Sequence, residues 1–124
     1  MTQDYVAGSC NIGTAEIALR RRVGHAGLAT TAVAAAALLR SDLPRPWRLT
    51  LALPATGAAA GYLQARQRFC ADFGYRGVYN FEHRGHEDQV PTEQARQRDR
   101  RRALQIGAAS AAIGVGVVVI ALLA

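Results

Sequence analysis

The chain has 124 residues, of which 50% are hydrophobic, and its formal net charge of +6 rests on arginine alone because it contains no lysine. The polar remainder is too short for a large soluble core, which argues against a soluble enzyme with its own pocket. Two cysteines are also too few for a disulfide scaffold. Long uncharged stretches alternate with dense arginine clusters, and this pattern is typical of a small integral membrane protein.

Residues 1–22 are expected to form a polar N-terminal segment with a short amphipathic helix. Thr14 is the predicted N-cap, and Glu16 and Arg20 lie four residues apart, which suits an ion pair on a helix. The first membrane span is predicted at residues 23–39. At about 1.5 Å per residue it is roughly 25 Å long, which is at the short end for a bilayer.

The second span is predicted at residues 47–65, after a proline-containing turn. Pro54 is expected to kink this helix in its middle. Gly57 and Gly61 form a GxxxG pattern, which lets another helix backbone come close. The first span is rich in alanine and equally slim, so residues 23–65 are predicted to form a tight antiparallel transmembrane hairpin.

Residues 66–91 combine aromatic side chains with glycines, and we expect a cytoplasmic loop that lies flat at the headgroup level. A basic helix is predicted to begin with Thr92 as its cap and to run through residues 92–124. Its last part, residues 106–124, has no charged side chain and is the third predicted span. Ser110 and Gly114 offer this span a second small surface for helix packing.

The fold class predicted from these elements is all-α: an antiparallel two-helix transmembrane hairpin and a third, C-terminal transmembrane helix. Twelve arginines precede the first span or lie between the second and third spans, and three lie in the loop between the first two. By the positive-inside rule, the N-terminus is cytoplasmic and the C-terminus lies at the outer face of the membrane.

The arginines that flank the spans are the predicted contacts to anionic lipid or to an acidic partner. No recognisable nucleic-acid fold accompanies them, which argues against nucleic acid as the partner. The predicted lipid- or partner-binding residues are Arg20, Arg21, Arg22, Arg96, Arg98, Arg100, Arg101 and Arg102.

Cys10, Cys70, His83 and His86 all fall on the predicted cytoplasmic side and make a zinc-competent set of ligand types. The absence of a C-x-x-C spacing favours structural cysteines instead. His25 lies among small residues at the start of the first span, and haem or pigment ligation there is a further alternative. No cofactor is expected, with zinc and haem or pigment left open.

Two patches of sequence resemble a family of small uncharacterised bacterial membrane proteins. One is Cys10-Asn11-Ile12-Gly13 with Glu16-Ile17 and Arg20-Arg21-Arg22-Val23-Gly24; the other contains Leu53-Pro54, Gly61-Tyr62-Leu63-Gln64-Ala65 and Phe69-Cys70. The likeness covers roughly residues 10–81. It implies a membrane location and no particular activity.

The spans carry no ionisable residue at their midplane and the chain has no catalytic constellation, so we expect neither a transporter nor an enzyme. The predicted function is that of an accessory, assembly or stabilising subunit of a larger membrane complex. A thiol or metal site at the cytoplasmic face and a homo-oligomeric membrane protein are the alternatives.

Overall fold

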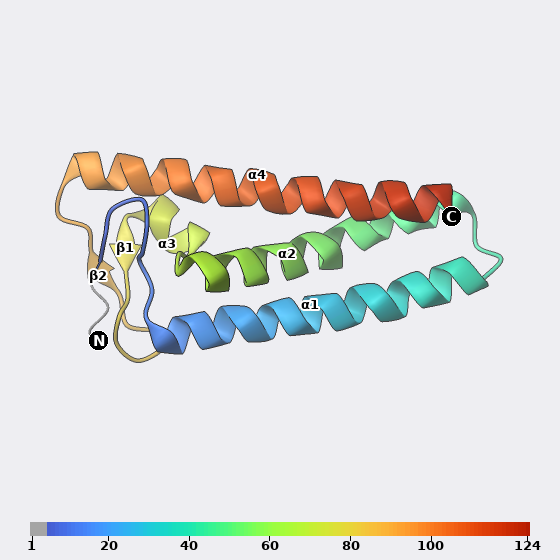
Figure 1. Ribbon diagram of the computed structural model, residues 1–124, viewed down its shortest axis with the longest axis horizontal. Coiled ribbons are helices and arrows are strands. Elements are labelled where there is room, and N and C mark those ends of the chain that lie inside the picture. The colour runs from blue at the N-terminus through green and yellow to red at the C-terminus, as the bar shows by residue number, and fades with distance from the viewer. Residues whose placement is uncertain (1–4) are drawn as a thin grey trace.

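Three long helical segments lie side by side in the computed structural model, which describes residues 5–124 (Figure 1). Helix α1 (Thr14–Arg40) and helix α4 (Glu93–Leu123) both pack against α2 (Ala52–Gln67), which lies between them. Helix α2 runs antiparallel to both. The chain is therefore mostly helical, and the all-α class is confirmed.

Two helices, α1 and α4, are long and apolar enough to cross a membrane. Only 6% of the most apolar stretch of α1 and 28% of that of α4 is buried within the chain, whereas a core helix of a soluble protein would be mostly buried. A membrane location is compatible with these two helices.

The segment predicted as the second span is divided. A 3-10 helix, η1 (Arg45–Leu51), leads directly into α2, which has 16 residues. The two together extend roughly 38 Å, from about 2.0 Å and 1.5 Å per residue respectively. Pro54 lies in the first turn of α2, where its missing N–H has no intrahelical partner to lose. Pro54 thus lies near the junction of η1 and α2 and not in the middle of one regular helix, and the kink stays a prediction.

Helix α1 is continuous from Thr14, so the predicted N-terminal helix leads directly into the first span, and the predicted Thr14 cap is wrong. The N-cap position is Gly13, which has no side chain with which to cap. Its N–H donates to the carbonyl of Asn80 at 2.8 Å, and a Cβ added to it would lie 3.0 Å from Phe81 Cα. The close approach of residues 80–81 to Gly13 therefore determines where α1 begins. By contrast, Thr92 does cap α4, because its Oγ1 accepts from the N–H of Ala95.

Residues 66–91 were expected to lie flat, but they fold into a compact unit with the N-terminal residues. The unit contains α3 (Ala71–Arg76) and an antiparallel pair of strands, β1 (Val78–Tyr79) and β2 (Asp88–Gln89). We call residues 5–13 and 68–92 the cap. It covers the end of the bundle at which α1 and α4 begin (Figure 1).

Apolar side chains explain why the cap is compact. Phe69 is fully buried against Ala103 and Ile106 of α4, and Phe73 packs with Ile12 in a second cluster. Gly74 permits this arrangement, since a Cβ there would stand 2.6 Å from the Phe69 ring. The predicted interfacial loop, like the loose N-terminal start, is thus replaced by a small core.

Candidate functional site

Close helix contact begins at Gly24 and Gly61. A Cβ added to Gly61 would lie 2.5 Å from the Gly24 backbone nitrogen, and one added to Gly27 would lie 2.7 Å from the backbone nitrogen of Ala58. Gly61 is therefore the member of the predicted GxxxG pattern that meets α1. Gly57 has no atom within 4 Å of such a Cβ and takes no part in this contact.

The other predicted packing residues lie between α4 and α2. A Cβ added to Gly114 would clash with the Thr56 hydroxyl and come within 3.2 Å of the Ala52 carbonyl oxygen. Ser110 is buried, and its hydroxyl donates to the Ile106 carbonyl within its own helix. Small residues on α4 therefore seat it on α2.

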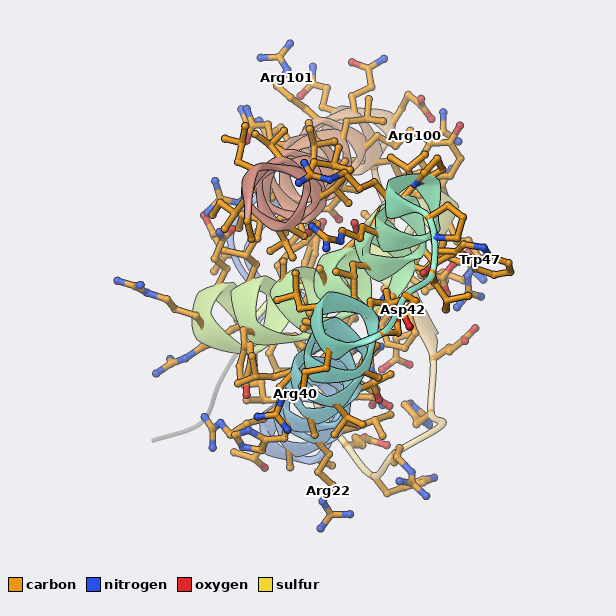
Figure 2. All side chains as sticks on the ribbon, turned by 90° about the vertical axis from the view of Figure 1, so that its right-hand side faces the viewer. Arg22, Arg40, Asp42, Trp47, Arg100 and Arg101 are labelled. Atoms are coloured by element: carbon orange, nitrogen blue, oxygen red, sulfur yellow. The ribbon has the colours of Figure 1, made fainter. Side chains whose placement is uncertain are left out.

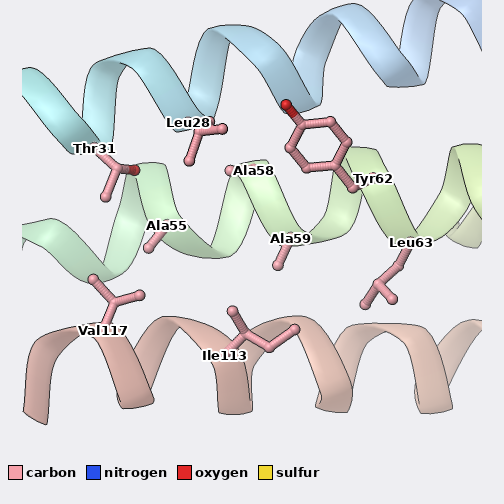
Figure 3. A pocket seen from close by; sticks show the side chains of 9 residues that line it. All are labelled: Leu28, Thr31, Ala55, Ala58, Ala59, Tyr62, Leu63, Ile113 and Val117. Carbon is pink, nitrogen blue, oxygen red and sulfur yellow. The ribbon is translucent and has the colours of Figure 1, made fainter. Parts of the chain in front are cut away.

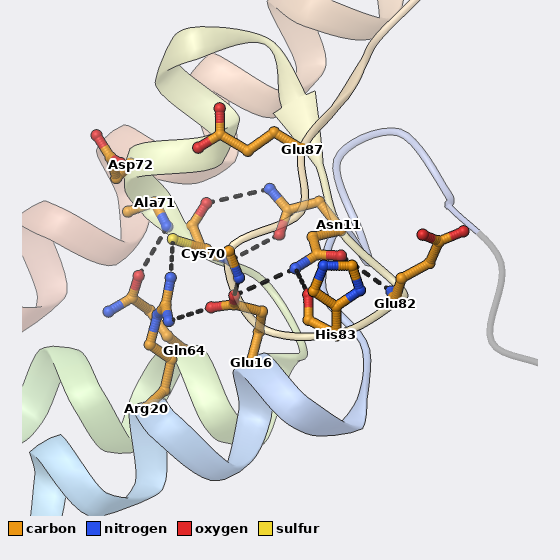
Figure 4. A network of polar contacts seen from close by, with 12 residues as sticks. Asn11, Glu16, Arg20, Gln64, Cys70, Ala71, Asp72, Glu82, His83 and Glu87 are labelled. Atoms are coloured by element: carbon orange, nitrogen blue, oxygen red, sulfur yellow. Dashed lines mark hydrogen bonds and ion pairs between the residues drawn. The ribbon is translucent and has the colours of Figure 1, made fainter.

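A buried ion pair stands where α1 enters the cap (Figure 4). Arg20 Nη1 donates to Glu16 Oε2 at 2.6 Å, and the Glu16 side chain is only 3% exposed. The second carboxylate oxygen accepts from Asn80 Nδ2 at 3.2 Å and from the Gly85 N–H at 3.1 Å. A buried charge needs such a full set of partners, so this carboxylate fastens the β1–β2 connection to α1.

Asn11 ties the N-terminal segment to the start of α3. Its Nδ2 donates to the Cys70 carbonyl at 3.1 Å, and its Oδ1 accepts from the Cys70 N–H at 2.7 Å. The Cys70 thiol itself faces Arg20, whose Nη2 lies 2.8 Å from Sγ. Gln64 completes the joint, because its Oε1 accepts from the Ala71 N–H at 2.8 Å (Figure 4).

A second buried carboxylate, Asp99, lies within the arginine block of α4. Its two oxygens accept from the Tyr5 hydroxyl at 2.6 Å and from the Gly8 N–H at 2.7 Å. Burial, followed by the hydrogen bond to Asp99, raises the pKa of Tyr5. The ring of Tyr5 also stacks on that of Tyr79 at 4.8 Å. Asp99 thus anchors residues 5–8 to α4.

The two cysteines have different surroundings. Both are free, and burial raises the pKa of the Cys10 thiol, whose Sγ lies near the Ile12 carbonyl oxygen. The rings of His83 and His86 are 5.6 Å apart at the edge of the cap. Within residues 5–124, no group of three or more histidine, cysteine, aspartate or glutamate side chains is placed to hold a metal ion. The proposed four-ligand set is not assembled here.

His25 is engaged by a neighbouring helix. Its Nδ1 lies 2.6 Å from the Tyr62 hydroxyl, and the two rings meet edge to face. This hydrogen bond links the exposed His25 of α1 to the half-buried Tyr62 of α2, and it gives His25 a structural role.

The predicted lipid- or partner-binding arginines divide into two groups. Arg20 is directed inward to Glu16, Arg96 donates to the Val90 carbonyl, and Arg100 donates to the Tyr75 carbonyl. These three therefore make contacts within the chain, and their binding of lipid or a partner stays a prediction. In the described chain the remaining five have no ion pair or hydrogen bond: Arg21, Arg22, Arg98, Arg101 and Arg102. Arg22 and Arg101 point away from the bundle on opposite sides (Figure 2).

Several residues that build or anchor the cap are not predicted from sequence patterns. Asn11, Asn80 and Asp99 are fully buried and polar, and none was singled out. The available signal was the position of Asn11 within the Cys10–Gly13 patch and of Asp99 as the one acid among many arginines. Arg45 and Arg48 were missed as well: they donate to the Leu122 and Ala121 carbonyls and so satisfy the end of α4.

No protein-family model matches the sequence, and neither a curated protein nor a solved structure matches it. The family resemblance of residues 10–81 therefore remains a prediction, and function has to be argued from the geometry alone.

Proposed function

We propose that the chain is a three-span membrane protein with its cap in the cytoplasm, and that it serves as a non-catalytic accessory subunit of a larger bacterial inner-membrane complex. The membrane placement is supported by α1 and α4, which bury little of their apolar surface. The orientation is supported by the concentration of arginine at the capped end of the bundle.

The observation that carries the subunit role is the outer face of α4. Ala108, Ala112 and Gly116 follow one another at intervals of four residues, so they share one face of the helix. All three are exposed, and a Cβ on Gly116 would meet nothing within 4 Å. The chain uses Ser110 and Gly114 for its own packing and leaves this second small-residue row for another helix.

The cap fits a role in assembly better than a role in chemistry. The buried carboxylates that fasten it to the helices, Glu16 of α1 and Asp99 of α4, are engaged by donors from the chain. Next to it, α4 carries Arg98 and Arg101, which have no ion pair in the described chain and suit an acidic surface on a partner.

The experiment compares two neighbouring glycines. Tagged chains carrying Gly116→Leu or Gly114→Leu are extracted in mild detergent alongside the wild type, and co-eluting proteins are identified by mass spectrometry. We expect Gly116→Leu to lose the partner while keeping wild-type thermal stability. Gly114→Leu should be less stable, because it breaks the α2–α4 contact. Recovery of the wild type as a free monomer, or an unchanged partner with Gly116→Leu, would contradict the proposal.

Self-association is tested by the same samples. Gly57 is open on α2, so a second copy is an alternative occupant of the membrane faces. Light scattering of the detergent complex then shows an oligomer of this chain alone, and Gly57→Leu should reduce its mass.

A thiol function is the second candidate, and one contact favours it. The Arg20 guanidinium lies against Cys70 Sγ, and reactive cysteines commonly have a positively charged neighbour. Against it, Cys70 is only 2% exposed. A thiol role requires Cys70 to react with a small alkylating reagent in the folded protein and the cellular phenotype to be lost in Cys70→Ser.

A further inference from the structure

An apolar groove runs along the face of α2 between α1 and α4 (Figure 3). Its volume is about 290 Å³. Alanines of α2 form its floor, and larger side chains of the two outer helices form its walls. The lining residues are Leu28, Thr31, Ala55, Ala58, Ala59, Tyr62, Leu63, Ile113 and Val117.

Three arginines lie on the same side of the three helices, beyond the capped end of the groove. On α2, Tyr62 follows Ala59 by three residues and Arg66 follows Tyr62 by four, so all three lie on the face of the helix that forms the groove. On α1, Arg21 lies seven residues, or about two turns, before Leu28. On α4, Arg102 lies eleven residues, or about three turns, before Ile113.

The helix contacts place these arginines at a similar level. Gly24 stands opposite Gly61, so Arg21 and Arg66 are three and five residues further toward the cap. Gly114 stands opposite Thr56 and Ala52. Toward the cap, Arg102 lies twelve residues from Gly114 and Arg66 lies ten residues from Thr56, so the two arginines are at a similar level along the bundle. Differences of a few residues amount to about one helical turn, which a long arginine side chain can span.

The positive charges at this end of the groove are free. Within residues 5–124, Arg21, Arg66 and Arg102 have no carboxylate partner. The Nε of Arg102 is buried and has no hydrogen-bond partner in the described chain. This contrasts with Arg20 and Arg96, which are engaged within the cap. The Arg102 guanidinium therefore has a donor left over for an acceptor that the described chain does not supply.

From this arrangement we infer that the groove binds one anionic phospholipid of the cytoplasmic leaflet, with an acyl chain along α2 and the phosphate among Arg21, Arg66 and Arg102. The occupant is set by charge complementarity: the groove is apolar, and its membrane-surface end carries three arginines from three helices. A membrane helix of a partner would fill the groove but would leave these guanidinium groups without acceptors.

The inference rests on the membrane placement proposed above but does not need the proposed partner. Purified protein in mild detergent is mixed with dioleoyl-phosphatidylglycerol or with dioleoyl-phosphatidylcholine, and retained lipid is counted by native mass spectrometry. We expect one retained phosphatidylglycerol per chain and at least tenfold weaker retention of phosphatidylcholine. Equal retention of the two lipids would overturn the inference.

Two charge-matched variants locate the phosphate. Arg21→Gln/Arg66→Gln/Arg102→Gln should reduce phosphatidylglycerol retention at least tenfold. Arg22→Gln/Arg98→Gln/Arg101→Gln removes the same charge from outward positions and should leave retention unchanged. Arg66 is exposed, so the single variant Arg66→Gln keeps its fold and should by itself weaken retention severalfold. Equal losses in the two triple variants would show a diffuse charge effect and overturn the site.

The acyl chain is located by cross-linking. Phosphatidylglycerol with a photoreactive diazirine in mid-chain should label Leu28 and Ile113, with the labelled residue located by fragmentation of the peptides, and labelling should fall in the Arg21/Arg66/Arg102 variant. Labelling spread evenly over outward residues such as Val33 and Val115 would overturn the groove assignment. If the proposed membrane placement itself were wrong, the chain would be recovered from cells without detergent. This outcome is distinct from a loss of lipid binding by a membrane-inserted chain.

Discussion

Gly24 of α1 and Gly61 of α2 lie so close that a Cβ atom on Gly61 would stand 2.5 Å from the Gly24 backbone nitrogen. This contact lies near the capped end of the bundle, beside the His25–Tyr62 hydrogen bond. It fixes how α1 lies on α2, and therefore the width of the groove that α2 presents between its two neighbours.

Gly61→Ala is expected to destabilise the protein by about 1–3 kcal/mol, because the added methyl group must push the two helices apart. The measure is unfolding of the detergent-solubilised protein, followed by its helical circular dichroism. Gly57→Ala is the matched control, since the space around Gly57 is open and alanine favours the helix. Equal effects of the two substitutions would contradict the contact.

Glu16→Ala should lower the free energy of unfolding by about 3 kcal/mol or more, because it leaves the Arg20 guanidinium partly buried without its carboxylate. Glu93→Ala serves as the control. Its pair with Arg96 is 3.8 Å long and largely exposed, so its loss should change stability by less than about 1 kcal/mol. A loss no larger for Glu16 than for Glu93 would show that the buried pair does not hold the cap.

Alkylation of Cys10 should be slow and shifted to high pH. Burial raises its thiol pKa, so less of the reactive thiolate is present than in an unfolded chain, whose cysteine pKa is about 8.5. The folded protein holds this proton more tightly, so the associated stability is complete below that value and declines as pH rises above it. Rates of Cys10 labelling, read by peptide mass spectrometry in folded and denatured protein, test this, and coincident pH profiles would refute it.

Tyr5 should stay protonated above pH about 10, where free tyrosine ionises. The raised pKa means that its contribution to stability is complete below that pH and is lost as pH rises further. The absorbance change of tyrosine ionisation, taken as wild type minus Tyr5→Phe, isolates this residue from the other three tyrosines.

Asp99→Ala should bring the ionisation of Tyr5 closer to that of free tyrosine, because it removes the carboxylate that accepts from the Tyr5 hydroxyl. It should also expose residues 5–13 to protease, since the Gly8 N–H loses its acceptor. An unchanged titration in Asp99→Ala would mean that the contact does not govern Tyr5.

The sequence was sufficient for the helices but not for the cap. Apolar stretches, arginine clusters and the Thr92 cap follow local rules, so the long helices and the start of α4 were predictable. The joint between Asn11 and Cys70 was not predictable, because its hydrogen bonds connect residues 59 positions apart and no sequence periodicity indicates such a contact. Gly57 and Gly61 show the same limit: spacing identified a small-residue face, and only packing determined which glycine meets α1.

The arginines were grouped by sequence alone, and this hid their separate roles. Arg20 and Arg21 are adjacent, yet helical rotation of about 100° per residue directs Arg20 into the cap and places Arg21 on the groove side. Arg66 was counted only as a topology signal. Arg66 lies on the face of α2 that carries Ala59 and Tyr62, and only the packing of α1 and α4 on α2 makes this face the floor of a groove.

The most direct test of the account is the membrane topology, which places the cap and the 41–44 loop on opposite sides. Asp42→Cys and Arg84→Cys are labelled in intact bacteria with a membrane-impermeant maleimide; both positions are exposed, and Asp42 lies at the end of the bundle away from the cap (Figure 2). The account predicts labelling of Asp42→Cys in intact cells and of Arg84→Cys only after permeabilisation. Labelling of both positions in intact cells, or the reverse pattern, would contradict it.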